Sequence, residues 1–398
     1  MGHSMGDLDL FNPTPEHRAL RQTVRAFAER EVEPQALASD RSEHFNLPLF
    51  RKLGELGLLG ITVDERFGGA GMDAVAAVIA HEELAAVDPG FTLAYLAHAM
   101  LFVNNVFLNA SDEQRERYLP DACAGRTVCG MCMSEPGAGT DVLGLATTAE
   151  RRGDGYVLNG AKMWITNGAV DDQTLGDAFL VYARMKGAPR AQLTSFLVDK
   201  GTPGFSLGQR LKDKLGMRAS STAELVFEDC EVSERQRVGP EGGATLHMMR
   251  NLEIERVTLA AMSLGIARRS LDVMNRYARE RTSFGEPLAH FGQVQRHLAE
   301  SYAEWMAGRS YTYQTAAQID LGSAGHRLDS DGVKLFCATM AKNVADRAIQ
   351  VLGGYGYVGE YVVERLWRDA KLLEIGGGTI EAHQKNMTRE LAGRSIIR

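Results

Sequence analysis

The sequence predicts an α+β chain with an N-terminal α-helical domain, a middle antiparallel β-barrel-like domain and a C-terminal helical bundle. Three observations lead to this fold class. Apolar residues recur at helical spacing in the first third, short β-rich runs alternate with Gly, Asp and Pro turns in the middle, and long helical periods return from about Glu241. We expect the domains to span residues 8–124, 125–239 and 240–398.

Each domain carries the pattern of its own elements. In the first domain, Leu20, Val24 and Phe27 follow a helical period, and Asp73 and Ser111 stand where N-caps are expected. The strands expected next are Thr127–Met133, Tyr156–Leu158, Ala178–Ala183, Ser195–Val198 and Glu224–Phe227. The long helices expected last are about Gly242–Arg281, Gly292–Asp320 and Ser330–Leu352, with a shorter pair after them.

The charge balance bears on the class of partner. The 398 residues include 44 Lys and Arg and 51 Asp and Glu, a net charge of −7, so we expect no nucleic-acid partner. Apolar runs such as Ala74–Ala80 are far shorter than the roughly 20 residues that span a bilayer, and Met1–Asn12 lacks a signal-peptide pattern. We therefore expect a cytoplasmic protein without membrane insertion.

Five scattered cysteines make a disulfide framework improbable. Cys129 and Cys132 form a C-x-x-C pair, but no second Cys or His pair stands at metal-binding spacing. We expect no metal site. The run Gly354–Gly359 matches G-x-G-x-x-G, yet it follows a predicted helix rather than a strand, so a glycine-rich turn at a helix C-terminus is the favoured interpretation.

Two segments could together hold a planar ligand. Met131–Asp141 is a strand that breaks into a Gly/Pro loop rich in hydroxyl groups, and Lys162–Gly168 places Trp164 and Thr166 on one face of a strand. Such residues could bind a ring system by stacking and hydrogen bonds. A capped turn and a buried core Trp explain the same pattern equally well, so this point stays open.

Glu255 is the strongest single candidate for chemistry. It occupies an apolar helical stripe together with Met248, Leu252, Leu259 and Met262. Burial would raise the pKa of this carboxyl towards the range of a general base. The alternative is a structural carboxylate neutralised by Arg256 or another arginine, and the pattern alone slightly favours that alternative.

Six motifs occur in a family-specific order: Met133–Asp141, Trp164–Gly168, Lys214–Arg218, Arg281-x-x-Phe284-Gly285, Gln350–Gly354 and Arg368–Lys371. In order and spacing they resemble the acyl-CoA dehydrogenases, over about Leu8 to Arg398. The resemblance implies a three-domain fold whose last domain is a four-helix bundle, a homotetramer built as a dimer of dimers, and FAD held without a Rossmann fold.

The resemblance also implies residues for the cofactor. The flavin-ring side would be formed by Met131, Met133, Ser134, Gly139, Thr140, Trp164 and Thr166. A neighbouring subunit's FAD would be reached by Arg281, Phe284, Gln350, Gly353 and Gly354, whereas Thr379 and Glu381 would contact FAD within the subunit. One departure stands out: Gly292 replaces the Gln that relatives commonly carry, which puts one adenine contact in doubt.

The catalytic base implied by the resemblance is Glu255. Many members carry this Glu in an Ile-Tyr-Glu-Gly-Thr loop, but here the loop Ile375–Thr379 has no carboxylate, and Leu252–Arg256 is similar to the isovaleryl-CoA dehydrogenase type. Backbone N–H groups near Gly377 would polarise the thioester oxygen. The substrate contacts implied are Thr140, Glu253, Arg256, Gly376, Gly377 and Gly378.

Gly376 stands where straight-chain enzymes usually have Tyr, which would leave width for a branched acyl chain. The alternative is that it only relaxes the turn. The expected reaction is FAD-dependent dehydrogenation of a short or medium, branched acyl-CoA to the trans-2-enoyl-CoA, with an electron-transfer flavoprotein as acceptor. Its rivals are a long-chain or dicarboxylyl-CoA dehydrogenase, an acyl-carrier-protein desaturase, an O₂-using relative and a catalytically silent acyl-CoA-binding member.

Overall fold

The first part of the chain is helical in the computed structural model, which describes residues 9–393. Its helices are α1 (Pro15–Phe27), α2 (Glu33–Ser42), α3 (Leu47–Glu55), α4 (Ala74–Ala85), α5 (Pro89–Leu96), α6 (Asn104–Asn109) and α7 (Asp112–Cys123). π-Helical turns join α1 to α2 at η1 (Ala28–Val32) and α5 to α6 at η4 (Ala97–Val103). The predicted domain ends at residues 8 and 398 lie outside the described residues.

Two predicted helix starts are confirmed by side-chain caps. Asp73 accepts the Ala76 N–H at 2.9 Å at the start of α4. Ser111 and Gln114 form a reciprocal capping box at the start of α7. Because α4 is apolar and buried on every side, it lies at the centre of the helical layers and not on their surface.

One apolar stretch is longer than the runs considered in the sequence. Among the described residues, Pro89–Asn109 alone is long and apolar enough to cross a membrane, with a mean hydropathy of 1.5. However, 78% of it is buried inside the protein. This burial is typical of a core helix, and the stretch packs within the N-terminal helices.

The middle part forms one eight-stranded sheet in the order β6-β7-β3-β2-β4-β5-β8, with β1 paired to β4. The strands are β1 (Cys129–Cys132), β2 (Thr148–Arg152), β3 (Gly155–Thr166), β4 (Ala178–Met185), β5 (Leu193–Asp199), β6 (Phe205–Arg210), β7 (Thr222–Ser233) and β8 (Arg237–Val238). Most pairs are antiparallel, as predicted, but β1 and β2 both run parallel to β4. These strands are joined to β4 through long connections and not hairpins, which allows the parallel direction.

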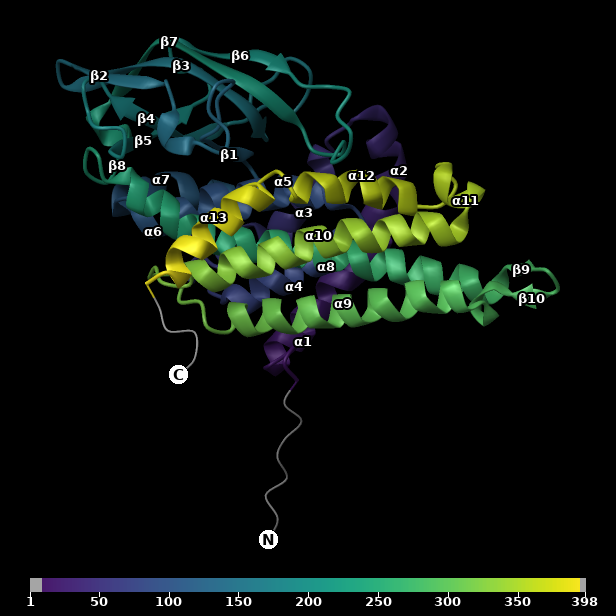
Figure 1. Ribbon diagram of the computed structural model, residues 1–398. Helices are drawn as coiled ribbons and strands as arrows, with labels where there is room; N and C mark the ends of the chain where they lie inside the picture. The colour runs from purple at the N-terminus through teal and green to yellow at the C-terminus, as the bar shows by residue number, and fades with distance from the viewer. Residues whose placement is uncertain (1–8, 394–398) are drawn as a thin grey trace.

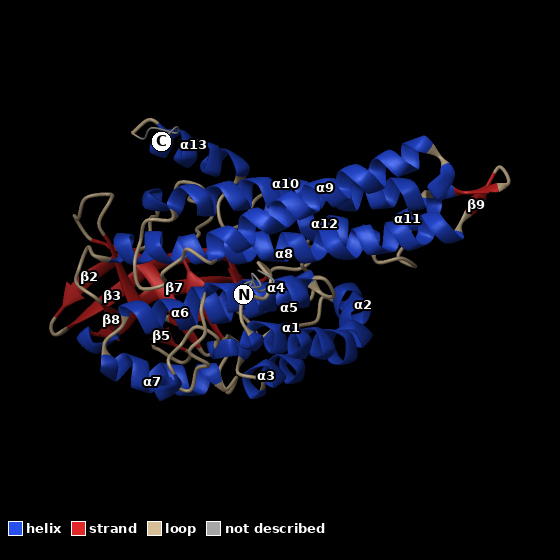
Figure 2. Ribbon diagram, turned by 90° about the horizontal axis from the view of Figure 1, so that it is seen from below, coloured by secondary structure: helices blue, strands red, loops and turns tan. Residues whose placement is uncertain are grey.

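The last part is built on three long helices. They are α8 (Ala244–Glu280), α9 (Gly292–Ala316) and α10 (Arg327–Leu352), followed by α11 (Gly354–Tyr357), α12 (Val363–Leu373) and α13 (Ile380–Leu391). A small hairpin, β9 (Thr282–Ser283) and β10 (Glu286–Pro287), joins α8 to α9. Figures 1 and 2 show this hairpin at the end of the long helices that lies farthest from the β-sheet.

The three parts pack against one another through specific close contacts. Gly265 of α8 is a glycine because α4 passes so near that an added Cβ would lie 2.4 Å from the Glu82 carbonyl oxygen. Two of the six motifs bond to each other between the sheet and the last part: Met217 N–H donates to Asp369 Oδ1 at 2.5 Å, and Arg368 Nη1 donates to the Leu215 carbonyl at 3.1 Å. The three-part fold predicted from the sequence is confirmed.

Candidate active site

Glu255 lies near the middle of α8 and is only 6% exposed. Its Oε2 has no hydrogen-bond partner among the described residues. Burial raises the pKa of Glu255 to about 7, although the charges of Arg256 and Lys334 act in the opposite direction. Arg256 does not neutralise it directly, because the Arg256 guanidinium pairs with Asp331 at 3.1 Å. A carboxyl group with a pKa in this range can exchange a proton near neutral pH.

The glycine loop between α12 and α13 faces Glu255. A Cβ added to Gly377 would lie 3.3 Å from Glu255 Oε1 and 2.2 Å from Leu259 Cδ1. Gly377 and Gly378 have φ values of +67° and +105°, which side-chain-bearing residues rarely adopt. Gly376 differs, because its backbone is ordinary and a Cβ there would meet nothing closer than 3.6 Å.

Two backbone donors of this loop have no acceptor. The Gly376 N–H donates to the Leu372 carbonyl at 2.8 Å, but among the described residues the N–H groups of Gly377 and Gly378 have no hydrogen-bond partner. An unpaired backbone N–H beside a buried carboxylate is a suitable donor to an oxygen that gains negative charge during a reaction.

Glu253 and Arg256, both implied substrate contacts, do not bond to each other. Glu253 accepts the backbone N–H groups of Gly325 at 3.3 Å and His326 at 3.0 Å, at the start of α10, whereas Arg256 bonds Asp331. The three-residue spacing on α8 allowed a pair within that helix. Partners on α10 were available to both groups, and each side chain bonds to this neighbouring helix instead.

The strand that carries Met131 approaches the same region. Met131 and Met133 pack in one apolar cluster with Met248 and Leu252, which precede Glu255 on α8. Tyr182 of β4 belongs to this cluster too, and burial followed by the Glu255 carboxylate raises the pKa of its hydroxyl. The structure thus brings Glu255, the glycine loop and the predicted flavin-side methionines together.

Trp164 has an unusual conformation for a large aromatic residue. It is 55% exposed and has a φ of +60°, at a point where the pairing of β3 with β7 shifts register. The intervening Ile165 is buried, whereas Trp164 and Thr166 are not. Positive φ at a bulky residue is uncommon and is found where function requires it. Met163 N–H donates to the Ser134 carbonyl at 2.9 Å, which places Ser134 beside the residue that precedes Trp164.

A buried ion pair positions the loop after β1, and sequence reasoning missed it. Lys162 Nζ donates to Glu135 Oε1 at 2.9 Å and to the Met133 carbonyl at 3.1 Å. Glu135 also accepts the backbone N–H groups of Ala146 and Thr147. Burial disfavours the charge of Glu135, but Lys162 and these donors outweigh burial and lower its pKa. Gly139 and Thr140, farther along this loop, face open space and solvent respectively.

The second predicted FAD set lies at the far end of the long helices. Arg281 and Gly354 line one recess of about 460 Å³, together with Tyr355 and Val358. Phe284 stands at the tip of the β9–β10 hairpin, 95% exposed and with a φ of +51°. The remaining members, Gln350 and Gly353, are exposed at the end of α10. Within one chain, this second set of residues therefore lies away from the β-sheet, which carries the first set (Figure 1).

Thr379 and Glu381 lie at the start of α13. Thr379 is the N-cap of this helix, and its hydroxyl accepts the Ala382 N–H at 3.2 Å. Glu381 is exposed in the first turn. Both residues therefore follow the glycine loop directly.

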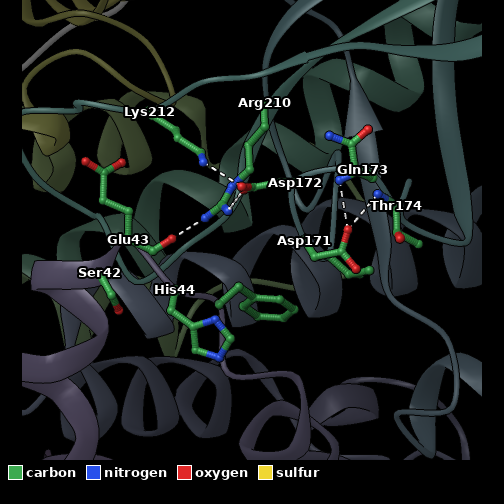
Figure 3. Close-up of a pocket in the computed structure, with 11 residues that line it drawn as sticks. Ser42, Glu43, His44, Asp171, Asp172, Gln173, Thr174, Arg210 and Lys212 are labelled. Atoms are coloured by element: carbon green, nitrogen blue, oxygen red, sulfur yellow. Dashed lines mark hydrogen bonds and ion pairs between the residues drawn. The ribbon is translucent and has the colours of Figure 1, made fainter.

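A larger open recess, of about 680 Å³, lies between the α2–α3 connection and the sheet (Figure 3). Asp172 forms ion pairs with both Arg210 and Lys212, and Asp171 accepts hydrogen bonds from the backbone N–H groups of Gln173 and Thr174. The polar groups that line this recess are thus largely paired with one another. None of the predicted site residues lines it.

No group of three or more His, Cys, Asp or Glu side chains within residues 9–393 is arranged to hold a metal ion. The five cysteines are free and buried, and burial raises the pKa of Cys337 to about 12. They are therefore packed as small apolar side chains.

Family models for the acyl-CoA dehydrogenase N-terminal, middle and C-terminal domains match residues 14–126, 130–230 and 242–392. The chain belongs to the acyl-CoA dehydrogenase family. The chain is 42% identical to mitochondrial isovaleryl-CoA dehydrogenase of Oryza sativa subsp. japonica, over 96% of this chain and 92% of that protein. Membership makes it a flavoprotein oxidoreductase acting on CH–CH bonds and supports the dehydrogenation of an acyl-CoA.

Two solved structures show the same fold. A glutaryl-CoA dehydrogenase from Mycobacterium smegmatis in complex with FADH₂ is 29% identical, with a TM-score of 0.89 and 98% of each chain covered. A structure described as the electron transferring flavoprotein of Acidaminococcus fermentans is 33% identical, with a TM-score of 0.91, over 96% of this chain and 100% of that one.

Proposed function

We propose that this member of the family dehydrogenates a short or medium, branched acyl-CoA similar to isovaleryl-CoA, to the trans-2-enoyl-CoA. One observation carries the proposal: the buried Glu255 carboxylate lies against Gly377, whose N–H has no partner among the described residues. Glu255 removes the α-proton, and the Gly377 N–H donates to the thioester oxygen as that oxygen gains charge. The likeness to isovaleryl-CoA dehydrogenase supports the branched substrate.

The residues present fit FAD. Trp164 offers a half-exposed ring on a backbone with a positive φ, which is uncommon for a large residue, and the Ser134 carbonyl accepts the N–H of the preceding residue, Met163. When bound, FAD supplies the acceptor for the hydride that leaves the β-carbon. The chain's own part is to hold the flavin against Trp164 and Thr166 and to orient the thioester between Gly377 and Glu255.

A second copy of the chain completes the cofactor site in this proposal. Trp164 belongs to β3 of the sheet, whereas Arg281 directly precedes the β9–β10 hairpin, which lies at the end of the long helices farthest from the sheet (Figures 1 and 2). The recess of Arg281 and Gly354 and the exposed Phe284 would meet the adenosine-pyrophosphate half of a neighbour's FAD. We propose the homotetramer, a dimer of dimers, as the assembly that arranges this.

Gly376 supplies the width for a branched chain. Its φ lies outside the left-handed range and an added Cβ would make only ordinary van der Waals contacts with Leu372, so the turn does not require glycine at this position. This favours a role in substrate shape over a role in chain conformation. We also propose an electron-transfer flavoprotein as the acceptor, which the likeness to the Acidaminococcus structure supports.

Anaerobic mixing with a panel of thioesters tests the function. The panel contains isovaleryl-CoA, straight-chain butyryl-, octanoyl- and palmitoyl-CoA, glutaryl-CoA and an acyl-carrier-protein thioester. We expect isovaleryl-CoA to bleach the flavin fastest and to yield the 2-enoyl-CoA. Fastest bleaching by palmitoyl- or glutaryl-CoA would contradict the substrate, and no bleaching by any member would contradict the reaction. Peroxide formation on aerobic turnover would contradict the acceptor.

A further inference from the structure

The carbonyl of Gly378 is held by two side chains from different helices. Lys334 of α10 donates from Nζ at 2.6 Å, and His383 of α13 approaches the same oxygen with Nε2 at 3.0 Å. Lys334 and His383 are both fully buried. A Cβ on Gly378 would lie 2.9 Å from His383 Cε1, so glycine is needed for this approach.

The protonation of His383 follows from its neighbours. The Gly378 carbonyl can only accept, so Nε2 must carry a hydrogen. On the other side of the ring, Nδ1 lies 2.5 Å from Asp331 Oδ1, and one proton lies between these two atoms. Asp331 also receives Arg256, the residue that follows Glu255. A continuous chain of bonds therefore runs from the glycine loop back to the helix of Glu255.

This chain of bonds fixes a segment that has little rigidity of its own. Gly377 and Gly378 are consecutive glycines with left-handed φ values, and glycine backbone is the most costly to order. With the Gly378 carbonyl held from the side of α10 and α13, the loop keeps the orientation in which Gly377 lies against Glu255.

We propose that Lys334 and His383 are positioning residues that hold the Gly376–Gly378 loop so that the Gly377 N–H meets the thioester oxygen. The inference rests on the proposed function, because it assigns these residues to the same reaction. Lys334 has a second effect, since its charge, when it is protonated, favours the ionised form of Glu255; burial lowers the pKa of Lys334 itself to about 7. The charged and titratable groups around Lys334 and His383 are Glu255, Arg256, Asp331 and Glu374, and Arg327 lies 3.8 Å from Asp331.

The pH dependence of flavin reduction separates this role from a purely structural one. Lys334→Met removes a charge that lowers the pKa of Glu255, so the acidic limb of the rate should move to higher pH by about one unit or more. Lys334→Arg keeps the charge, so the acidic limb of the pH–rate curve should stay at its wild-type position. Lys342→Met, on the same helix, is the matched control and should leave it in place. An unshifted limb in Lys334→Met would overturn the role of the charge.

A second measurement does not depend on turnover. An acyl-CoA analogue with sulfur in place of the β-carbon cannot release hydride, but its α-proton can still be removed, and the resulting enolate beside oxidised flavin absorbs at long wavelength. In His383→Ala and Lys334→Met we expect this band to form only at higher pH than in the wild type, with FAD content and thermal melting unchanged. Should Lys334→Met fail to fold, His383→Gln, which can still donate to Gly378, is compared with His383→Ala.

The outcomes distinguish the inference from the proposed function. A wild type that gives neither bleaching nor the long-wavelength band would contradict the proposed function. A wild type that gives both, with unaltered behaviour of His383→Ala and Lys334→Met, would overturn only the positioning role. Wild-type pH dependence in Lys334→Arg and His383→Gln, together with altered pH dependence in Lys334→Met and His383→Ala, would support the positioning role.

Discussion

Gly377 approaches Glu255 so closely that a single added Cβ would stand 3.3 Å from the carboxylate oxygen Oε1. These two segments, more than 100 residues apart in the sequence, meet because α12 and α13 pack along α8 and α10. The Glu255 carboxylate and the loop that carries the unpaired Gly377 N–H group therefore lie side by side.

Gly377→Ala should impair the reaction without removing the cofactor. The added methyl group would meet Leu259 Cδ1 at 2.2 Å, and φ is +67°, so the loop must move and carry its N–H away. Loss of one backbone donor to a developing oxyanion costs about 10²–10³ in rate. Stopped-flow flavin reduction measures this. Gly376→Ala is the control and should keep most of the rate, because its Cβ meets only ordinary contacts.

Gly376→Tyr should reverse substrate preference. The backbone at Gly376 accepts a side chain, so the ring would fill space and not distort the turn. Because a pocket distinguishes one methyl group by about 10–200-fold, branched thioesters should lose most of their kcat/KM while straight ones keep much of theirs. Equal losses for both classes, or a wild type that prefers straight long chains, would contradict this role.

Arg281→Ala should weaken FAD retention although Arg281 lies far from Trp164 in the same chain. The reason is that the arginine would serve the cofactor of a neighbouring subunit. FAD content per chain and the assembly state, measured together by absorbance and light scattering, check this. Arg279→Ala changes an exposed arginine on the same helix and should retain FAD. Full FAD content in Arg281→Ala would remove the cross-subunit site.

The rate of flavin reduction should rise with pH through about 7. A carboxyl whose pKa is raised is protonated below that pH and cannot accept the α-proton, and it becomes ionised above it. The dependence of kcat/KM on pH between about 6 and 9 reports the free enzyme. A rate independent of pH over this range would mean that Glu255 is ionised throughout.

Much of the site could be predicted from the sequence because it depends on local patterns. The predicted apolar stripe around Glu255 is a buried helix face in the structure, and the caps at Asp73 and Ser111 form as expected. Motif order also identified the family, because such motifs preserve loop shapes such as that of Trp164. These features need only residues close together in the chain.

The remaining features depend on contacts between distant segments. Asp331, Lys334 and His383 are charged or titratable residues that sequence patterns would place on a helix surface, and their burial becomes evident only when α10 and α13 pack beside α8. The pairing of Arg256 with Asp331 could not be predicted for the same reason, because residue spacing within one helix does not reveal an acid on another.

Glu255→Gln tests the central claim most directly. Glutamine keeps the size of the side chain but cannot accept the proton, so anaerobic mixing with isovaleryl-CoA should show flavin reduction slowed by about 10²–10⁴-fold or more, with FAD content and fold unchanged. The neighbouring Glu253→Gln, whose carboxylate bonds the start of α10, is the matched control and should retain far more of the rate. Near-normal flavin reduction in Glu255→Gln would contradict the account.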